Sequence, residues 1–225
     1  MQRLRLKFGR GNALKFISHL NVLHSWERSI RRANIPLAYS QGFTPHPQIS
    51  VAAPLAVGMT SEAELMDIRL TGWIPPQSVT MKLREQIACG FQLYQTWIVG
   101  LNTPSLQSVV SFANYSVIIN SQYKQQDVEN AIQSLLHKEQ LPWHHPRGEK
   151  THYYDLRALI DDIWVESCDE VRYTLGMRLC CGCAGSGRPE QVTYALGFSE
   201  YPESIHRTEI SLQRPLEYKV KNKII

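Results

Sequence analysis

The 225-residue sequence has no long apolar run, and no stretch approaches the ~18 consecutive apolar residues of a membrane-spanning helix. Segment 1–11 alternates basic and apolar residues, so we expect no secretory signal there. Cysteine is scarce, and its five residues follow no regular framework, which is typical of a protein from the reducing cytosol. We therefore expect a cytoplasmic protein without a membrane partner.

Motifs of familiar enzyme and metal sites are also absent. The sequence has no Ser-His-Asp order, no paired catalytic carboxylates and no G-x-G-x-x-G, and the Gly-rich turn at 184–190 lacks the Lys-Ser/Thr of a P-loop. The C-C-G-C run at 180–183 supplies one C-x-x-C pair, half of a typical zinc site. His144, His145 and His152 offer at most a loose metal site in a polar loop. We expect no metal and no cofactor.

Charge is distributed unevenly along the chain. Residues 1–112 hold 11 Lys and Arg against 5 Asp and Glu, a net charge of +6, whereas residues 113–225 hold 13 against 15, a net charge of −2. This asymmetry predicts a polyanionic partner for the first half. A basic, solvated surface without a partner would give the same counts.

The two halves repeat one order of predicted elements. In the first half these are a strand at 3–8, a helix at 18–33, strands at 49–53 and 63–70, a helix from 75 and a strand at 91–99. In the second half they are a strand at 115–119, a helix at 127–137, strands at 153–165 and 171–179, a helix at 189–196 and a strand at 205–212. The repeat, offset by about 111 residues, predicts an α+β fold of two tandem ferredoxin-like (βαββαβ) units with antiparallel sheets. We place these units at 1–101 and 113–225, joined by a linker at 102–112.

Three arginines on the first predicted helix are candidate phosphate ligands. Arg28, Arg31 and Arg32 lie in its C-terminal half, and guanidinium groups match phosphate with paired hydrogen bonds. Cations at this end of a helix also oppose the negative end of its dipole, which is an equally good structural reason for them. Glu62, Glu64 and Asp67 are expected to pair with these arginines.

The loop after this helix carries candidate base-binding side chains. Tyr39, Phe43 and His46 lie in it, and prolines on both sides of His46 fix the local backbone. Aromatic and imidazole rings stack on bases while arginines contact phosphates, so the combination favours nucleic-acid binding. Alternatively, the loop is a stiff connector in which Phe43 packs into the core.

His19 is a candidate general base if the protein is an enzyme. It falls in the first turn of the predicted helix, where the helix N-terminus lowers the pKa of an imidazole. A packed or surface histidine without a chemical role fits the same pattern.

Several segments resemble the radical SAM-linked domain family of unknown function. They are R-L-R-L-K-F (3–8), F-I-S-H-L-N (16–21), E-R-S-I-R-R-A (27–33), L-A-Y-S-Q-G-F-T-P-H-P-Q-I-S (37–50), L-A-V-G (55–58) and S-E-A-E-L-M-D-I (61–68). The resemblance implies a radical SAM protein as a partner. The chain has Asn21 where Asp is usual, and it has no C-x-x-x-C-x-x-C motif, so it is not itself the radical SAM enzyme.

Three functions follow as hypotheses. The first is a non-catalytic accessory protein that binds RNA, such as tRNA or rRNA, and presents it to a radical SAM partner. The second is a metal-independent endoribonuclease with His19 as base, by analogy with the CRISPR repeat-processing enzymes. The third is an adaptor that contacts only the radical SAM protein.

Overall fold

The N-terminal elements follow the predicted order. The structure, a computed structural model, describes residues 1–147, 150–169, 171–182 and 185–213. Its first elements are β1 (Gln2–Arg10), a 3₁₀ turn (Asn12–Leu14), α1 (His19–Arg32), β2 (Ile49–Val51), β3 (Thr60–Leu70), α2 (Pro76–Arg84) and β4 (Phe91–Val99). The four strands are antiparallel and lie in the order β4-β1-β3-β2.

Both N-terminal helices cover the same face of these strands. Leu4, Leu6 and Phe8 alternate with basic residues on β1 and are buried, so one face of the strand packs against the apolar sides of α1 and α2. Trp26 of α1 fills the centre of this core, with its ring centroid 4.8 Å from that of Phe8. The opposite face of β1 carries Arg3, Arg5 and Lys7.

The C-terminal elements repeat this strand order and add a hairpin. They are α3 (Leu106–Val109), β5 (Val110–Asn120), α4 (Gln125–Leu136), β6 (Pro142–Arg147), β7 (Lys150–Asp155), a 3₁₀ turn (Arg157–Leu159), β8 (Ile160–Cys168), β9 (Arg172–Gly182), β10 (Gly185–Ser186), α5 (Pro189–Ala195) and β11 (Ser204–Leu212). The antiparallel order β11-β5-β9-β8 corresponds to β4-β1-β3-β2 in the first half.

Three local predictions differ from the structure. The strand predicted at 153–165 is two strands, β7 and β8, separated by a 3₁₀ turn. The polar loop predicted around His144 and His152 is the β6-β7 hairpin, in which His144 lies opposite Tyr153. The segment 102–112 holds α3 and the start of β5.

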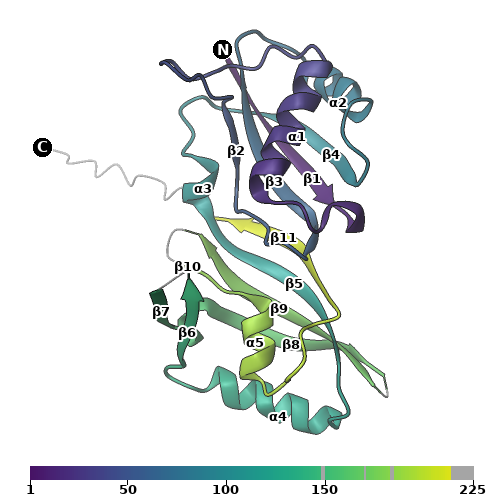
Figure 1. The fold of residues 1–225 in the computed structure, drawn as a ribbon, viewed down its shortest axis with the longest axis vertical. Helices are drawn as coiled ribbons and strands as arrows, with labels where there is room; N and C mark the ends of the chain where they lie inside the picture. The colour runs from purple at the N-terminus through teal and green to yellow at the C-terminus, as the bar shows by residue number, and fades with distance from the viewer. Residues whose placement is uncertain (148–149, 170, 183–184, 214–225) are drawn as a thin grey trace, which may run out of the picture.

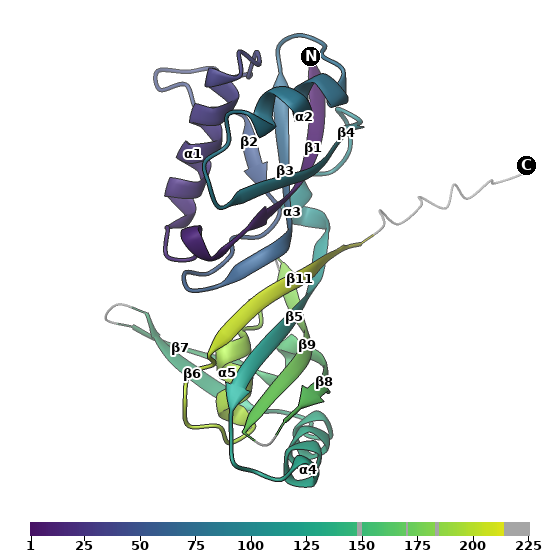
Figure 2. The same ribbon diagram turned by 90° about the vertical axis from the view of Figure 1, so that its right-hand side faces the viewer.

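The two halves share one mostly antiparallel sheet. β11 pairs with β5 on one side and, in parallel, with β3 at Thr60 and Ser61 on the other (Figure 1). β2 occupies the same edge of β3 further along, at Met66 to Ile68, so β11 takes over this edge where β2 no longer reaches. Figure 2 shows β11 running between the N-terminal strands and β5.

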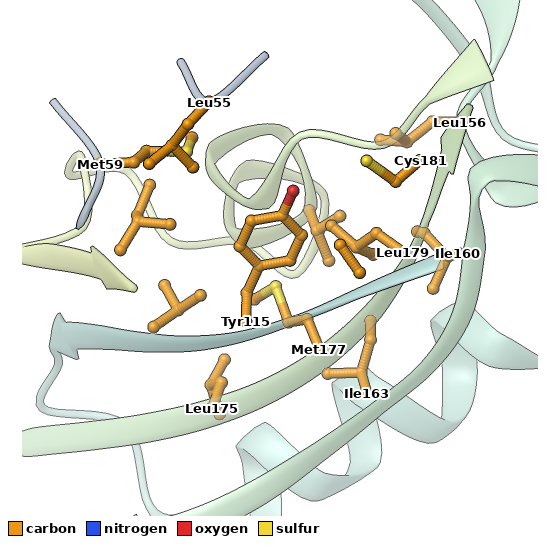
Figure 3. Close-up of a cluster of buried hydrophobic side chains, with 14 of the residues drawn as sticks. Leu55, Met59, Tyr115, Leu156, Ile160, Ile163, Leu175, Met177, Leu179 and Cys181 are labelled. Atoms are coloured by element: carbon orange, nitrogen blue, oxygen red, sulfur yellow. The ribbon is translucent and has the colours of Figure 1, made fainter. Parts of the chain in front are cut away.

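The core of the second half also includes side chains from the first. Leu55 and Met59, which precede β3, belong to the same buried cluster as Tyr115 of β5 and Met177 of β9 (Figure 3). In the described residues, no helix combines the length and apolar character needed to cross a membrane.

Candidate functional site

The basic character of the first half is largely at its surface. Of its 11 basic side chains, eight are exposed or half-buried, against three of its five acidic ones. The buried basic residues are Arg3, Arg5 and Arg10. The excess of positive charge in the first half therefore remains at the surface, where it is accessible to a polyanion.

α1 leaves the three predicted arginines exposed to solvent. The Ser18 side chain caps the helix by accepting a hydrogen bond from the backbone N–H of Asn21. Burial of Trp26 and Ile30 turns the opposite face, with Arg28 and Arg31, outward.

Arg32 is also exposed, but its guanidinium is already engaged. It donates a hydrogen bond to the backbone carbonyl of Gln86, which follows α2. The guanidinium groups of Arg28 and Arg31 form no hydrogen bond or ion pair with a described residue. These two are therefore the helix arginines available to an external anion.

The predicted binding loop is a short hairpin, residues 39–48, that projects between α1 and β2 (Figure 1). Tyr39 and Pro47 pair across it, and the Ser40 backbone N–H donates to the His46 carbonyl at 2.8 Å. The His46 N–H donates in turn to Ser40 Oγ at 2.9 Å. Phe43 at the tip is fully exposed, so the alternative that it packs into the core is wrong.

Tyr39 connects this hairpin to α1. Its phenol donates to Glu27 Oε1 at 3.2 Å, and Arg31 lies close enough to influence its ionisation. Burial, and then the Glu27 carboxylate, raise the pKa of Tyr39, so the phenol is neutral at pH 7. The contact holds the hairpin beside the arginine-bearing face of the helix. Together, these six predicted residues form what we call the α1-hairpin surface: Arg28, Arg31, Arg32, Tyr39, Phe43 and His46.

His19 does not join the α1-hairpin surface. Arg31 lies twelve positions further along α1, about 18 Å along the helix axis. Burial, and then the positive charge of Arg10, lower the pKa of His19, so its imidazole is neutral at pH 7. Arg10 itself is buried and donates to the carbonyls of Ala56 and Met59. The neutral His19 imidazole could therefore accept a proton. The nearby Arg10 guanidinium, however, is already bound to backbone carbonyls and is not free to stabilise a substrate anion.

The prediction that the acidic residues of β3 pair with the arginines of α1 is wrong. Glu64 forms a buried ion pair with Arg207 of β11. Asp67 binds Arg3 and Arg5 of the neighbouring strand β1. Since β3 lies between β1 and β11, its carboxylates face basic residues of those strands. The alternation of Arg3 and Arg5 with buried leucines was the available signal for a basic face on β1.

Exposed apolar side chains at the start of α1 were not predicted. Phe16 and Leu20 are 73% and 64% exposed, and the Lys15 ammonium lies 5.1 Å from the centroid of the Phe16 ring. An exposed pair of this kind beside a basic surface is suited to contact with a partner.

The cysteine run is partly buried. Cys181 is in the core, and burial raises the pKa of its thiol. Cys180 is half-buried with Sγ 3.6 Å from the carbonyl of Ala158, whereas Cys183 lies outside the described residues. Within the described ranges, no three metal-ligating side chains gather.

Comparison with known proteins gives a family and a fold. The model of a family described as "Uncharacterized protein conserved in bacteria" (DUF2344) matches residues 3–189. No curated protein matches the chain. One chain in the crystal structure of a Cbf5-Nop10-Gar1 complex is similar, with a TM-score of 0.52 and 8% identity over 92% of this chain and 48% of that one.

A second solved structure is less similar. It is the crystal structure of the archaeal box H/ACA sRNP Nop10-Cbf5 complex, with a TM-score of 0.45 and 7% identity over 91% of this chain and 46% of the other. The chain spans about half the length of both matching chains. At 8% identity, the likeness to the Cbf5-Nop10-Gar1 chain concerns the fold alone.

Proposed function

This chain belongs to the family of uncharacterized proteins conserved in bacteria (DUF2344), and on that premise we propose that it is a non-catalytic accessory protein that binds RNA. The observation that carries the proposal is the α1-hairpin surface. It combines two arginines without partners among the described residues with a projecting hairpin whose tip is a fully exposed phenylalanine.

The α1-hairpin surface offers separate side chains for the phosphates and for the bases of single-stranded or looped RNA. Arg28 and Arg31 bind phosphates, while Phe43 at the hairpin tip stacks on an unpaired base. The contact between Tyr39 and Glu27 fixes the hairpin against the helix, so little conformational entropy is lost on binding.

RNA binding is tested by fluorescence anisotropy with a labelled tRNA at several salt concentrations. We expect the Arg28→Ala/Arg31→Ala variant to bind at least tenfold more weakly at low salt, since each lost charge-assisted contact contributes more than a neutral one. The matched control is Lys124→Ala/Lys138→Ala, which removes two exposed cations flanking α4. No binding by the wild-type protein, or equal loss in both variants, rejects the proposal.

We infer that each half, 1–101 and 113–225, is a ferredoxin-like unit. The support is the repeated strand order and the packing of two helices on one face of each set of strands. The two proposed units share one sheet, because β11 pairs with β3.

The proposed partner is a radical SAM protein, and this part rests on the sequence resemblance. Affinity purification of the full chain from its native host, followed by mass spectrometry and sequencing of bound RNA, tests it. A radical SAM protein together with RNA supports the complete proposal. If RNA is recovered without a radical SAM protein, the proposed partner is rejected and the proposed RNA-binding function is retained.

The adaptor function has one observation in its favour, the exposed Phe16 and Leu20. The adaptor hypothesis is favoured over RNA binding if the purified complex contains a protein partner and no RNA, and if Phe16→Ala/Leu20→Ala releases that partner. The endoribonuclease hypothesis requires RNA cleavage in chelator that His19→Ala abolishes. The separation of His19 from the α1-hairpin surface gives it less support.

A further inference from the structure

The face of the N-terminal sheet opposite α1 and α2 holds a buried excess of positive charge. Arg3 and Arg5, 4% and 7% exposed, share the single carboxylate of Asp67. Arg5 donates to both of its oxygens, through Nε at 2.7 Å and Nη2 at 3.0 Å. Arg3 donates to Oδ2 through Nε at 3.0 Å and Nη2 at 2.6 Å. Two buried guanidinium groups thus face one carboxylate.

A third guanidinium adds to this excess. Arg69 lies directly opposite Arg3 in the register of β1 and β3, so both side chains belong to the same face. The Arg69 side chain is exposed, and its guanidinium forms no hydrogen bond or ion pair with any described residue. Like charges directly opposite each other destabilise a sheet unless an anion compensates them.

These groups border a cavity of about 270 Å³. Arg3, Asp67 and Arg69 line it from the sheet, Ser50 lines it from β2, and Ser105 lines it from the segment before α3. The backbone of that segment anchors Arg3, whose Nη1 and Nη2 donate to the carbonyls of Thr103 and Pro104 at 2.6 and 2.9 Å. Two N–H groups of Arg3 thus bond to these carbonyls and two bond to Asp67, so four of its five N–H groups are used and its guanidinium is fixed at the cavity wall.

We propose that this cavity is a phosphate-binding site, occupied by inorganic phosphate or by the phosphate group of a nucleotide or an RNA end. A buried charge without a counterion is costly, and a dianion in the cavity would balance Arg3, Arg5 and Arg69 against Asp67. Guanidinium forks and serine hydroxyls are suited to phosphate oxygens. The site lies on the other side of the sheet from α1, so it does not rest on the proposed RNA interface.

The test is isothermal titration of the full chain with inorganic phosphate in a chloride buffer. We expect saturable binding by the wild-type protein and at least tenfold weaker binding by Arg69→Ala, which removes an exposed side chain and leaves the buried cluster intact. Lys82→Ala, an exposed cation on α2, is the matched control and should bind as the wild type does. Absence of saturable binding, or equal affinity of wild type and Arg69→Ala, overturns the site.

A second measurement distinguishes the sources of the phosphate. The affinities of two oligoribonucleotides, one with a 5′-phosphate and one with a 5′-hydroxyl, are measured on the Arg28→Ala/Arg31→Ala variant. This variant lacks the proposed phosphate ligands of the α1-hairpin surface, so the result does not depend on whether that surface binds RNA. Tighter binding of the phosphorylated oligonucleotide that is lost in Arg69→Ala supports an RNA end as the ligand. If the two oligonucleotides bind with equal affinity and the protein still binds inorganic phosphate, the ligand is a free phosphate compound rather than an RNA end.

Discussion

Arg207 and Glu64 lie 143 positions apart and form a fully buried ion pair between β11 and β3. Arg207 Nη2 is 2.6 Å from Glu64 Oε1, and the two side chains are 1% and 4% exposed. The same nitrogen donates to the carbonyl of Ala53 at 3.0 Å. Since β11 pairs with β3 at only two positions, this side-chain contact extends the connection between the halves.

Removing one partner of this pair is predicted to destabilise the whole protein. Glu64→Leu leaves the Arg207 guanidinium buried without a counterion, which costs about 3–5 kcal/mol in the free energy of unfolding. Arg207→Met added to Glu64→Leu removes the uncompensated charge and should recover much of this loss. Urea denaturation monitored by circular dichroism measures both effects.

An exposed ion pair supplies the control for that experiment. Arg172 and Glu203 are 49% and 43% exposed, so Glu203→Gln should change the unfolding free energy by only about 0–1 kcal/mol. If Glu64→Leu proves as mild as Glu203→Gln, the buried pair does not hold the halves together.

His19 should make the fold less stable in acid. Burial and Arg10 lower its pKa in the folded protein below the ordinary value of 6.5, so the unfolded chain binds more protons as the pH falls. Stability from this group is therefore present above the unfolded pKa and is lost as the pH falls from that value towards the folded pKa. His19→Asn should lose less stability than wild type between pH 7.5 and 5, as measured by thermal unfolding. An NMR titration that places the His19 pKa above 6.5 contradicts this prediction.

The sequence predicts local structure well where periodicity decides it. Leu4, Leu6 and Phe8 alternate because one face of β1 is buried, and Ser18 caps the helix through its own hydroxyl. The segment around His144 and His152 was predicted as a polar loop, but it forms the β6-β7 hairpin, in which Pro142 and Pro146 are tolerated because both strands lie at a sheet edge.

Contacts between distant segments were not predictable in the same way. Nothing local in the sequence indicates that Arg207 meets Glu64, because the pairing depends on the parallel contact of β11 with β3. The exposure of Arg28 and Arg31 is consistent with helical periodicity, since the buried Trp26 defines the opposite face. The hydrogen bond from Tyr39 to Glu27 depends on how the hairpin folds back, which no spacing shows.

The two free arginines of α1 should contribute a measurable part of the salt dependence of RNA binding. Each phosphate contact with a single strand contributes about 0.7 to the slope of log affinity against log salt concentration. Arg28→Ala/Arg31→Ala should therefore reduce the slope by roughly 1.4 if both side chains contact phosphates. Anisotropy titrations at four or more salt concentrations measure the slope, and an unchanged slope indicates that neither arginine touches the RNA backbone.

Phe43 should affect RNA binding without affecting the fold. Because its side chain is fully exposed at the tip of the hairpin, Phe43→Ala removes no buried contact, and the unfolding free energy should stay within about 0.5 kcal/mol of wild type. Loss of one stacked base costs about 1–3 kcal/mol, so RNA affinity should fall at least fivefold while the salt slope stays constant. Tyr153→Ala, which removes a 76% exposed ring from β7, is the aromatic control and should bind normally. Equal affinities of wild type and Phe43→Ala would show that the hairpin tip meets something other than a base.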